Sequence, residues 1–365
     1  MARGNNAPMI DDSTSRPTDC FVRQTPAGLY CAPGGFYVDP MRPVDRAVVT
    51  HAHSDHARVG SRHYLAAEPS RHVLSGRMAG DADLQWLPYG QTITVGGVTV
   101  SFHPSGHMLG AAQVRMEYRG QVVVVTGDYK IDDDPTCQPW APVQCHVLVT
   151  ESTFGLPVYR WPDSTAEFAS INAWWRRCRD AGKCAVLYGY AVGKSQRLIA
   201  GLDDSIGPIY THGAVEKGNE AYRASGVSLQ DTQAVASLSQ KPDYRGAMVV
   251  AVPSAHGTPW LRRFGRISTA MASGWMAVRG ARRRRSVDRG FVISDHVDWP
   301  SLQLAVQQCR PESVWVTHGY SAVVARYLNE TGVHAIPLEG GRSVGSDDDV
   351  DSADDGDGDD QEAPS

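Results

Sequence analysis

The chain has 365 residues, of which 21% are charged, and a formal net charge of −5 at pH 7. This length allows two domains, or one large domain with an insertion. No apolar run approaches the ~18 residues of a membrane span, and the polar residues 1–18 lack the apolar segment of a secretory signal, so we expect a cytoplasmic protein that does not enter a membrane.

The acidic charge is concentrated at one end of the chain. Residues 347–365 contain ten acidic residues and no basic one, so the rest of the chain is net positive. We predict a disordered acidic tail over residues 341–365 and a flexible arm over residues 1–19, because such compositions bury little apolar surface. The tail either solubilises the protein or mimics nucleic acid in a basic groove. The seven cysteines include no C-x-x-C pair, which argues against disulfides and a cysteine zinc site.

The first part of the chain is rich in short apolar segments that are typical of strands. The predicted strands cover residues 36–39, 46–50, 92–95, 98–103, 113–118, 121–127 and 146–150. Directly after His56 we predict a helix, whose N-terminus would be a favourable place for a phosphate.

From Gly155 onward, helical and strand patterns alternate. Residues 164–167 have the form of a capping box and predict a helix to about residue 180. The predicted strands that follow are 184–188, 207–211 and 247–252, with helices over 195–202 and 215–224. This alternation favours an α/β unit with a mostly parallel sheet. The chain then continues with strand 291–293, helix 299–309, strand 313–317, helix 321–330 and a last strand at 333–337.

The segment of residues 51–56 places three imidazoles and a carboxylate directly after the apolar run 47–49. In an extended backbone His51 and His53 point to the same side and can bind one metal ion. Asp55 and His56 can supply a second. Imidazole and carboxylate ligands suit zinc, with manganese or iron as alternatives. The competing interpretation is a surface histidine cluster without metal.

Two metal ions need more ligands than one loop supplies. Further candidates lie at or near the ends of predicted strands: Asp39, His107, Asp128 and His318. Each of them alone is most simply an ordinary polar residue. Their shared position at strand ends favours a common site.

This ordered series of residues resembles the metallo-β-lactamase fold. Asp39, residues 51–56, His107 and Asp128 look like the four metal-site motifs of that fold. Its β-CASP nuclease branch has three further motifs. Their counterparts here are Glu151 in Thr-Glu-Ser-Thr-Phe-Gly, His296 in Ser-Asp-His and His318 in Thr-His-Gly.

The resemblance implies an α/β fold, a metallo-β-lactamase αββα sandwich with an inserted β-CASP α/β domain. The sandwich would comprise residues 20–154 and 286–340, and the insertion residues 155–285. Within the branch, the residues Arg282, Arg283, Arg284 and Arg285 and the segment 274–276 look like those of bacterial DNA-ligase-associated exonucleases. These are relatives of Artemis-type DNA repair nucleases and of the nuclease that trims messenger RNA 3′ ends.

The resemblance also implies a role for each site residue. His51, His53 and His107 would hold one metal ion; Asp55, His56 and His318 would hold the other; and Asp128 would bridge them. Asp39 would orient a ligand histidine rather than bind metal. The catalytic residues would be Asp128, together with His296 and Glu151. His296 would protonate the leaving oxygen or stabilise charge on the phosphate, and Glu151 would fix the ring of His296.

Two basic segments predict contacts with nucleic acid. Gly193-Lys194-Ser195 lacks the spaced glycine of a P-loop and resembles instead a glycine-lysine/arginine turn of the insertion, from which Lys194 and Arg197 would meet the substrate backbone. Residues 261–290 contain nine arginines and one acid, with aromatic residues interleaved. Arginines bind phosphates and aromatic rings stack on bases, although such a run is often only a solvated face.

We therefore expect a metal-dependent nuclease with two divalent ions, zinc or else manganese. The resemblance favours a DNA exonuclease in DNA repair that works with a DNA ligase and a helicase. An RNA 3′-end processing exo- or endoribonuclease and a hydrolase of a small substrate are the alternatives. A non-catalytic scaffold is a further possibility, against which the intact ligand positions argue.

Overall fold

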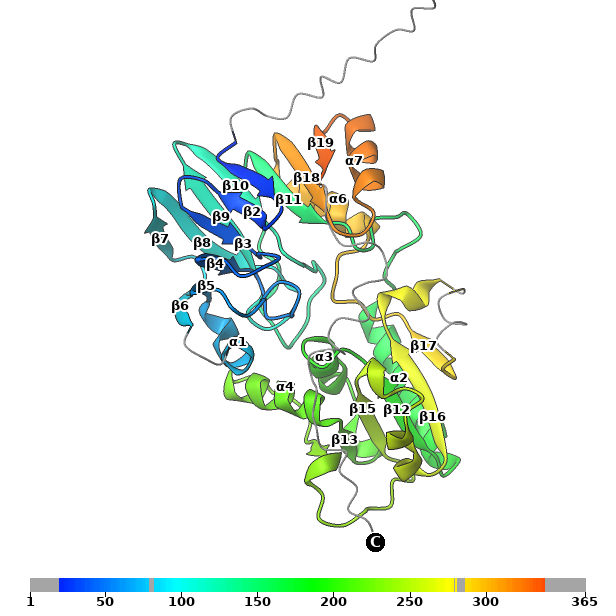
Figure 1. The fold of residues 1–365 in the computed structure, drawn as a ribbon. Coiled ribbons are helices and arrows are strands. Elements are labelled where there is room, and N and C mark those ends of the chain that lie inside the picture. The colour runs from blue at the N-terminus through cyan, green and yellow to red at the C-terminus, as the bar shows by residue number, and fades with distance from the viewer. Residues whose placement is uncertain (1–19, 79–81, 279, 281–285, 339–365) are drawn as a thin grey trace, which may run out of the picture.

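The computed structural model describes residues 20–78, 82–278, 280 and 286–338. The strands in this part of the chain form three sheets (Figure 1). The α/β class expected from the sequence is confirmed. No helix among the described residues is long and apolar enough to cross a membrane.

The first sheet has the strand order β1–β2–β3–β4–β5–β6. Its first three strands are antiparallel, and β3 to β6 run parallel. The bounds are Val22–Thr25 (β1), Gly28–Cys31 (β2), Phe36–Val38 (β3), Arg46–Val49 (β4), His63–Ala67 (β5) and Asp83–Leu87 (β6).

The second sheet has the order β19–β18–β11–β10–β9–β8–β7. Strands β7 to β10 are antiparallel, whereas β10, β11, β18 and β19 are parallel. The bounds are Thr92–Val95 (β7), Val98–Pro104 (β8), Ala112–Tyr118 (β9), Gln121–Val125 (β10), Val147–Glu151 (β11), Ser313–Thr317 (β18) and Ala335–Pro337 (β19).

The valine run of β10 shows how these two sheets pack. Side chains alternate between the faces of a strand, and a strand that is covered on both faces is apolar throughout. Val123 and Val125 pack against the first sheet, where they meet residues such as Val48. Val122 and Val124 pack on the other side, against helices α6 (Trp299–Cys309) and α7 (Ser321–Glu330).

The outer face of the first sheet is covered in the same way. Ala47 and Val49 of β4 pack against Leu74 of helix α1 (Arg71–Arg77). The order of layers is therefore α1, first sheet, second sheet, and α6 with α7.

The third sheet is parallel throughout, with the order β14–β13–β15–β12–β16–β17. Its strands are Cys184–Tyr188 (β12), Ile209–Thr211 (β13), Gln233–Ala234 (β14), Met248–Ala251 (β15), Ile267–Ala272 (β16) and Arg289–Phe291 (β17). Helices α2 (Ser164–Asp180), α3 (Lys194–Ala200) and α4 (Gly213–Ala224) pack with it in one core. Helix α4 also contacts α1 of the first layer (Figure 1).

Short 3-10 helices complete the described secondary structure. They cover Glu68–Ser70, Asp204–Ile206, Val235–Ser237, Pro253–Ala255, Pro259–Phe264 and Gly274–Ala277.

Several local predictions were wrong. No helix follows His56: residues there form a turn in which the Ala57 amide donates to the His53 carbonyl, and α1 begins only at Arg71. A short turn spreads the side chains of this motif around a centre, which a helix would not do. Strands β1, β2, β5, β6, β14 and β16 and helix α1 were not predicted.

Several predicted boundaries also shift. The strand expected at 291–293 is β17, which covers Arg289–Phe291. Helix α2 is capped by Asp163, which accepts from the Ala166 amide, and Glu167 accepts from the Val292 amide instead of closing a capping box. The expected boundary at residue 285 falls before β17, which pairs with β16 and is part of the third sheet. The expected N-terminal arm, the acidic tail and Arg282, Arg283, Arg284 and Arg285 lie outside the described residues.

Candidate metal centre

The site lies where strands of the first two sheets end. Strands β10, β11 and β18 are parallel neighbours, so their carboxyl ends meet at one edge of the second sheet. They deliver Asp128, Glu151 and His318, and β4 of the facing sheet leads into His51. The loop between β8 and β9 adds His107.

Asp128 occupies the middle of this cluster. Its Oδ2 lies 3.5 Å from His51 Nε2 and 3.5 Å from His56 Nε2, and 3.9 Å from His107 Nε2. The carboxylate is thus equally close to one residue of each predicted ligand set. A bridging ligand between two metal ions needs this position.

The first predicted ligand set, completed by Asp128, is brought together. Ligand atoms of His51, His53, His107 and Asp128 all lie within 4.8 Å of one another. His107 Nε2 is 3.2 Å from His53 Nδ1, and His51 Nε2 is buried without a hydrogen-bond partner.

The outer nitrogen of each of these three rings contacts an oxygen. His51 Nδ1 lies 3.1 Å from Thr50 Oγ1, His53 Nε2 lies 3.0 Å from the Val192 carbonyl, and His107 Nδ1 lies 3.0 Å from the Asp295 carbonyl. A carbonyl can only accept, so the outer nitrogens of His53 and His107 must donate.

This assignment leaves lone pairs on the inner nitrogens. The Thr50 hydroxyl donates its proton to Asp39, so its oxygen accepts from His51 Nδ1. His51 therefore also carries its proton on the outer nitrogen and a lone pair on the inner one. His51 and His107 are buried and His53 is half-buried. Three lone pairs that converge in this way repel one another, and a cation between them relieves the repulsion. The donor set therefore fits a metal ion, and the outer hydrogen bonds are those expected of metal-binding histidines.

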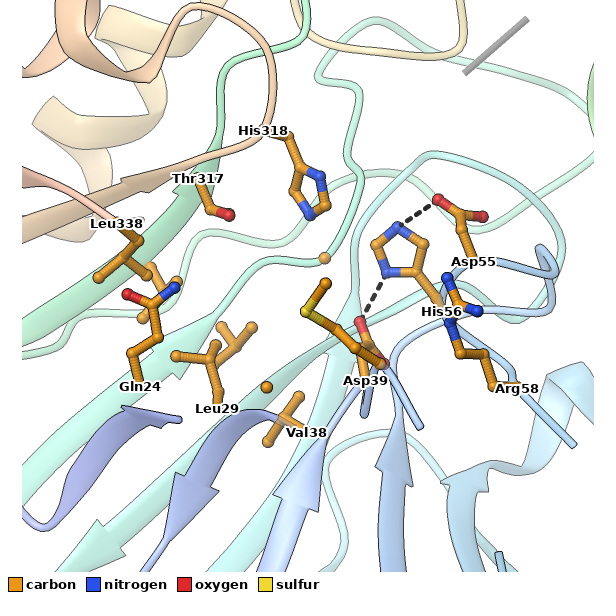
Figure 2. Close-up of a pocket in the computed structure, with 15 residues that line it drawn as sticks. Gln24, Leu29, Val38, Asp39, Asp55, His56, Arg58, Thr317, His318 and Leu338 are labelled. Carbon is orange, nitrogen blue, oxygen red and sulfur yellow. Dashed lines mark hydrogen bonds and ion pairs between the residues drawn. The ribbon is translucent and has the colours of Figure 1, made fainter. Parts of the chain in front are cut away.

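The second predicted set lines an adjacent pocket (Figure 2). His56 Nε2 lies 3.2 Å from Asp55, and the rings of His56 and His318 are 5.6 Å apart between centroids. His56 Nδ1 contacts Asp39 Oδ2 at 2.7 Å, and Asp39 also accepts from the Thr50 amide. Asp39 thus makes the orienting contact predicted for it, on His56.

Asp39 and His318 share a backbone feature. Both have positive φ, 44° at Asp39 and 55° at His318, which is uncommon for residues other than glycine. Each directly follows a strand, β3 or β18. Such strained residues cluster at functional sites, because the surrounding structure must hold them there.

His296 and Glu151 form the predicted carboxylate–imidazole pair. Both carboxylate oxygens of Glu151 lie 3.0 Å from His296 Nδ1, and the Tyr129 amide donates to Glu151. Burial acts to raise the pKa of Glu151, but His296 and these hydrogen bonds hold it below its ordinary value. Glu151, His296 and Asp128 also lie close enough to form a metal-binding group of their own.

The electrostatics of the centre favour a bound cation. Burial, reinforced by the charges of Glu151 and Asp55, raises the pKa of Asp128 to about 7 against the opposing effect of His56 and His296. Burial and neighbouring imidazoles hold the pKa of His51 well below its ordinary value. Neutral imidazoles are the form that binds metal.

His56 differs from His51. Burial acts to lower its pKa, but Asp55, Asp128 and Asp39 outweigh burial and raise the pKa of His56 well above its ordinary value. The positive charge of a proton on His56 is stabilised by these three carboxylates. The charge of a metal ion beside His56 would be stabilised in the same way.

Lys194 and Arg197 do not lie where we expected them. Both side chains are only 3% exposed and contact the carboxylate of Asp295, at 3.0 and 3.3 Å. Arg197 also lies 3.4 Å from Asp134. Their charge is balanced inside the protein, so the structure does not support contact between these two residues and a phosphodiester backbone.

Two further histidines make local contacts. His103 contacts Ser101 on β8. The ring of His212 accepts from the Ala214 amide and caps α4.

Sequence reasoning missed the groups that hold the outer nitrogens. The carbonyls of Val192 and Asp295 are main-chain atoms, for which no residue type is a signal. Thr50 stands directly before His51, and its hydroxyl joins Asp39 and His51. A threonine at the end of an apolar strand is too common to have indicated this role.

The chain is similar to several curated proteins. It is 29% identical over 310 residues to a "Probable DNA ligase" of Opitutus terrae, a match that covers 84% of this chain. It is 25% identical over 221 residues to "Cleavage and polyadenylation specificity factor subunit 3" of Dictyostelium discoideum, which covers 51% of this chain. It is 28% identical over 153 residues to "Endoribonuclease YSH1" of Yarrowia lipolytica, which covers 41%.

The matched regions are parts of longer proteins. They span 30%, 28% and 18% of these three relatives, respectively. No family model matches the chain. Among solved structures, a protein of unknown function from Enterococcus faecalis has a similar fold, with a TM-score of 0.54 at 10% identity over 80% of this chain and 78% of that one.

Proposed function

We propose that the chain is a metal-dependent nuclease with the metallo-β-lactamase fold of the β-CASP branch. The observation that carries this proposal is the convergence of the inner nitrogens of His51, His53 and His107 on Asp128. The layer order of helix, two sheets and helices supports the predicted αββα sandwich. The third sheet, which is parallel, lies between β11 and β18 in the sequence and supports the predicted insertion. In this proposal β17 is part of the insertion.

The proposed metal ligands keep the roles predicted from the sequence. His51, His53 and His107 would hold one divalent ion; Asp55, His56 and His318 would hold a second; and Asp128 would bridge them. Bound divalent ions, zinc or else manganese, would activate water and neutralise charge on the phosphodiester. Asp39 would hold His56 with Nε2 toward the ion.

His296 is the proposed proton donor to the leaving oxygen. Its Nδ1 is held by Glu151, so the proton would leave from Nε2. The buried Glu151 carboxylate orients the ring and stabilises the imidazolium. A positioned acid of this kind typically contributes about 10²–10⁴-fold to the rate.

The names of the relatives point to two different substrates, DNA and RNA. The probable DNA ligase matches most of this chain, whereas the cleavage factor subunit and the endoribonuclease match about half or less. This difference in coverage favours a DNA exonuclease in repair that works with a DNA ligase, and functionally with a helicase. The names of the other two favour the alternative, an RNA 3′-end processing nuclease.

A digestion panel tests the proposal. End-labelled single- and double-stranded DNA and RNA of one sequence are incubated with the purified chain and Zn²⁺ or Mn²⁺. We expect DNA to be shortened from an end, and chelation to stop the reaction. Cleavage of RNA without cleavage of DNA would instead support an RNA 3′-end processing nuclease. Absence of cleavage of every nucleic acid in the panel would contradict nuclease activity.

Contacts with nucleic acid by Arg282, Arg283, Arg284 and Arg285 are a further part of the proposal. These residues lie outside the described part of the chain, so the proposal rests on their sequence alone.

A further inference from the structure

Two of the metal-site histidines are oriented by segments of the third sheet. The Val192 carbonyl, in the turn between β12 and α3, contacts His53 Nε2 at 3.0 Å. The Asp295 carbonyl, in the loop after β17, contacts His107 Nδ1 at 3.0 Å. By contrast, the outer nitrogens of His51 and His56 are held by Thr50 and Asp39, close by in sequence.

Both carbonyls are fixed by the start of helix α3. Lys194 Nζ contacts the Asp295 carboxylate at 3.0 Å, and the Arg197 guanidinium lies 3.3 Å from the same carboxylate and donates to the Ser294 carbonyl. Arg197 also reaches Asp134, in the segment between β10 and β11. We call Lys194, Arg197, Asp134 and Asp295 the α3 ion-pair cluster.

The turn before α3 is equally constrained. Gly193 has φ of 90°, and a Cβ there would lie 3.2 Å from Met108 Cβ and 3.7 Å from His53 Nε2. Its amide donates to Gln196, whose side chain in turn donates to the Ala191 carbonyl. The turn therefore has little freedom to move the Val192 carbonyl away from His53.

The α3 ion-pair cluster is buried, and its two cations balance its two carboxylates. Removing one member leaves an uncompensated buried charge, which is strongly destabilising in its present position. The partner carboxylate then takes up a proton or moves toward water, and either change alters the contacts that hold Asp295. Movement of Asp295 displaces its main-chain carbonyl from His107. The cluster and the metal site are thus mechanically connected through one residue.

We infer that Lys194 and Arg197 are positioning residues for the metal site, which they serve by clamping Asp295 so that its carbonyl orients His107. Together with the Gly193 turn, they make retention of the metal ion at His53 and His107 depend on the docked third sheet. This inference rests on the proposed metal-dependent function.

The test measures metal affinity and leaves activity aside. The full chain is stripped of metal, and its Zn²⁺ affinity is determined by competition with a chromophoric chelator. Outer hydrogen bonds to metal-binding histidines are worth about 10–100-fold in affinity. Lys194 acts through Asp295, so Lys194→Met should weaken Zn²⁺ binding by about tenfold, the lower end of this range. Lys194→Arg, which keeps the charge, should restore most of the loss.

Arg223→Met is the matched control. Arg223, on the neighbouring helix α4, contacts the Glu216 carboxylate at 2.9 Å. It also donates to the Gln230 carbonyl and the Thr232 hydroxyl, none of which belongs to the metal site. Removing this cation should leave Zn²⁺ affinity unchanged. With Co²⁺ as the probe, the absorption spectrum, which reports ligand geometry, should change in Lys194→Met and not in Arg223→Met.

A glycine pair covers the case in which Lys194→Met does not fold. Gly193→Ala should weaken Zn²⁺ binding, because the new methyl group is strained and pushes toward Met108 and His53. Gly182→Ala also places a side chain at positive φ (62°), with nothing within 4 Å of the new Cβ, and should not weaken binding.

Unchanged Zn²⁺ affinity in both Lys194→Met and Gly193→Ala, with a wild-type protein that binds zinc, would overturn this inference and leave the proposed function intact. A folded wild-type protein that binds neither Zn²⁺ nor Mn²⁺ would overturn both, and one that binds only Mn²⁺ is compared with the same variants by using Mn²⁺.

Discussion

The metal centre and the α3 ion-pair cluster are neighbouring buried regions that balance charge in different ways. At the centre, the Asp128 carboxylate contacts imidazoles, and inner nitrogen lone pairs face one another. In the α3 ion-pair cluster, Lys194 and Arg197 already neutralise the carboxylates. The first region has a donor set that could hold a cation from solution, whereas the second carries its own cations.

This difference corrects how Lys194 and Arg197 are interpreted. From the sequence, a lysine and an arginine at the start of a helix were expected to contact a substrate backbone. In the fold they meet Asp295 and Asp134, which lie far from them in the sequence. Substitutions can separate residues that bind or orient the proposed metal ion from residues that take part in the ion pairs of Lys194 and Arg197.

Removal of the bridging carboxylate should have the largest effect. Asp128→Ala should abolish hydrolysis and lower the metal content, because Oδ2 is the atom common to both ligand sets. Metal analysis and the digestion panel check both outcomes. His103→Ala is the control, since His103 contacts Ser101 instead of the centre. An Asp128→Ala protein that cleaves normally would contradict the bridging role.

His296→Ala should come next, with kcat lowered by about 10²–10⁴-fold. Metal content should be nearly unchanged, because the residue is proposed to act on the leaving oxygen. The contrary outcome is informative: Asp128, Glu151 and His296 also lie within metal-binding distance of one another. If the variant loses one metal ion, His296 is a ligand and not the acid.

Asp39→Asn should weaken the binding of one metal ion by about 10–100-fold. The substitution removes the charge that holds His56, whereas asparagine tolerates the positive φ at this position. Zinc competition measures the loss. Asp83→Asn is a matched control, because Asp83 makes a similar contact with His63, at 3.1 Å, on the exposed surface. If the two variants bind zinc with equal affinity, Asp39 does not contribute to the metal site.

The smallest effect should come from neutralising Arg282, Arg283, Arg284 and Arg285. Binding of single-stranded DNA in chelator should weaken, and the slope of log affinity against log salt should fall by about one unit for each lost phosphate contact. Lys194→Met should leave that slope unchanged, because Lys194 is paired internally. If Lys194→Met lowers the slope and the arginine variant does not, then Lys194 contacts DNA and these four arginines do not.

The sequence was most informative where a local pattern determines a position. The valine run of β10 ends just before Asp128, and the apolar end of β4 leads into His51, so strand ends predicted side chains that the fold brings together. Helices α2, α4, α6 and α7 were also predicted close to their observed bounds. In each case a periodic apolar pattern coincides with burial.

The rest depended on contacts between distant segments. Strand β16, with Ser268 and Thr269 in its middle, has no apolar alternation, and pairing with β12 and β17 stabilises it as a strand. The turn after His56 replaces the predicted helix because its side chains must surround one centre. The partners of Lys194 lie about a hundred residues away, at a separation where spacing carries no signal.

Metal stoichiometry of the purified, folded chain tests the central claim most directly. The protein is supplied with Zn²⁺, freed of unbound metal by gel filtration and analysed for metal per chain. The account predicts about two transition-metal ions per chain, both released by a strong chelator without loss of secondary structure. A content near zero in a protein that remains folded would contradict it.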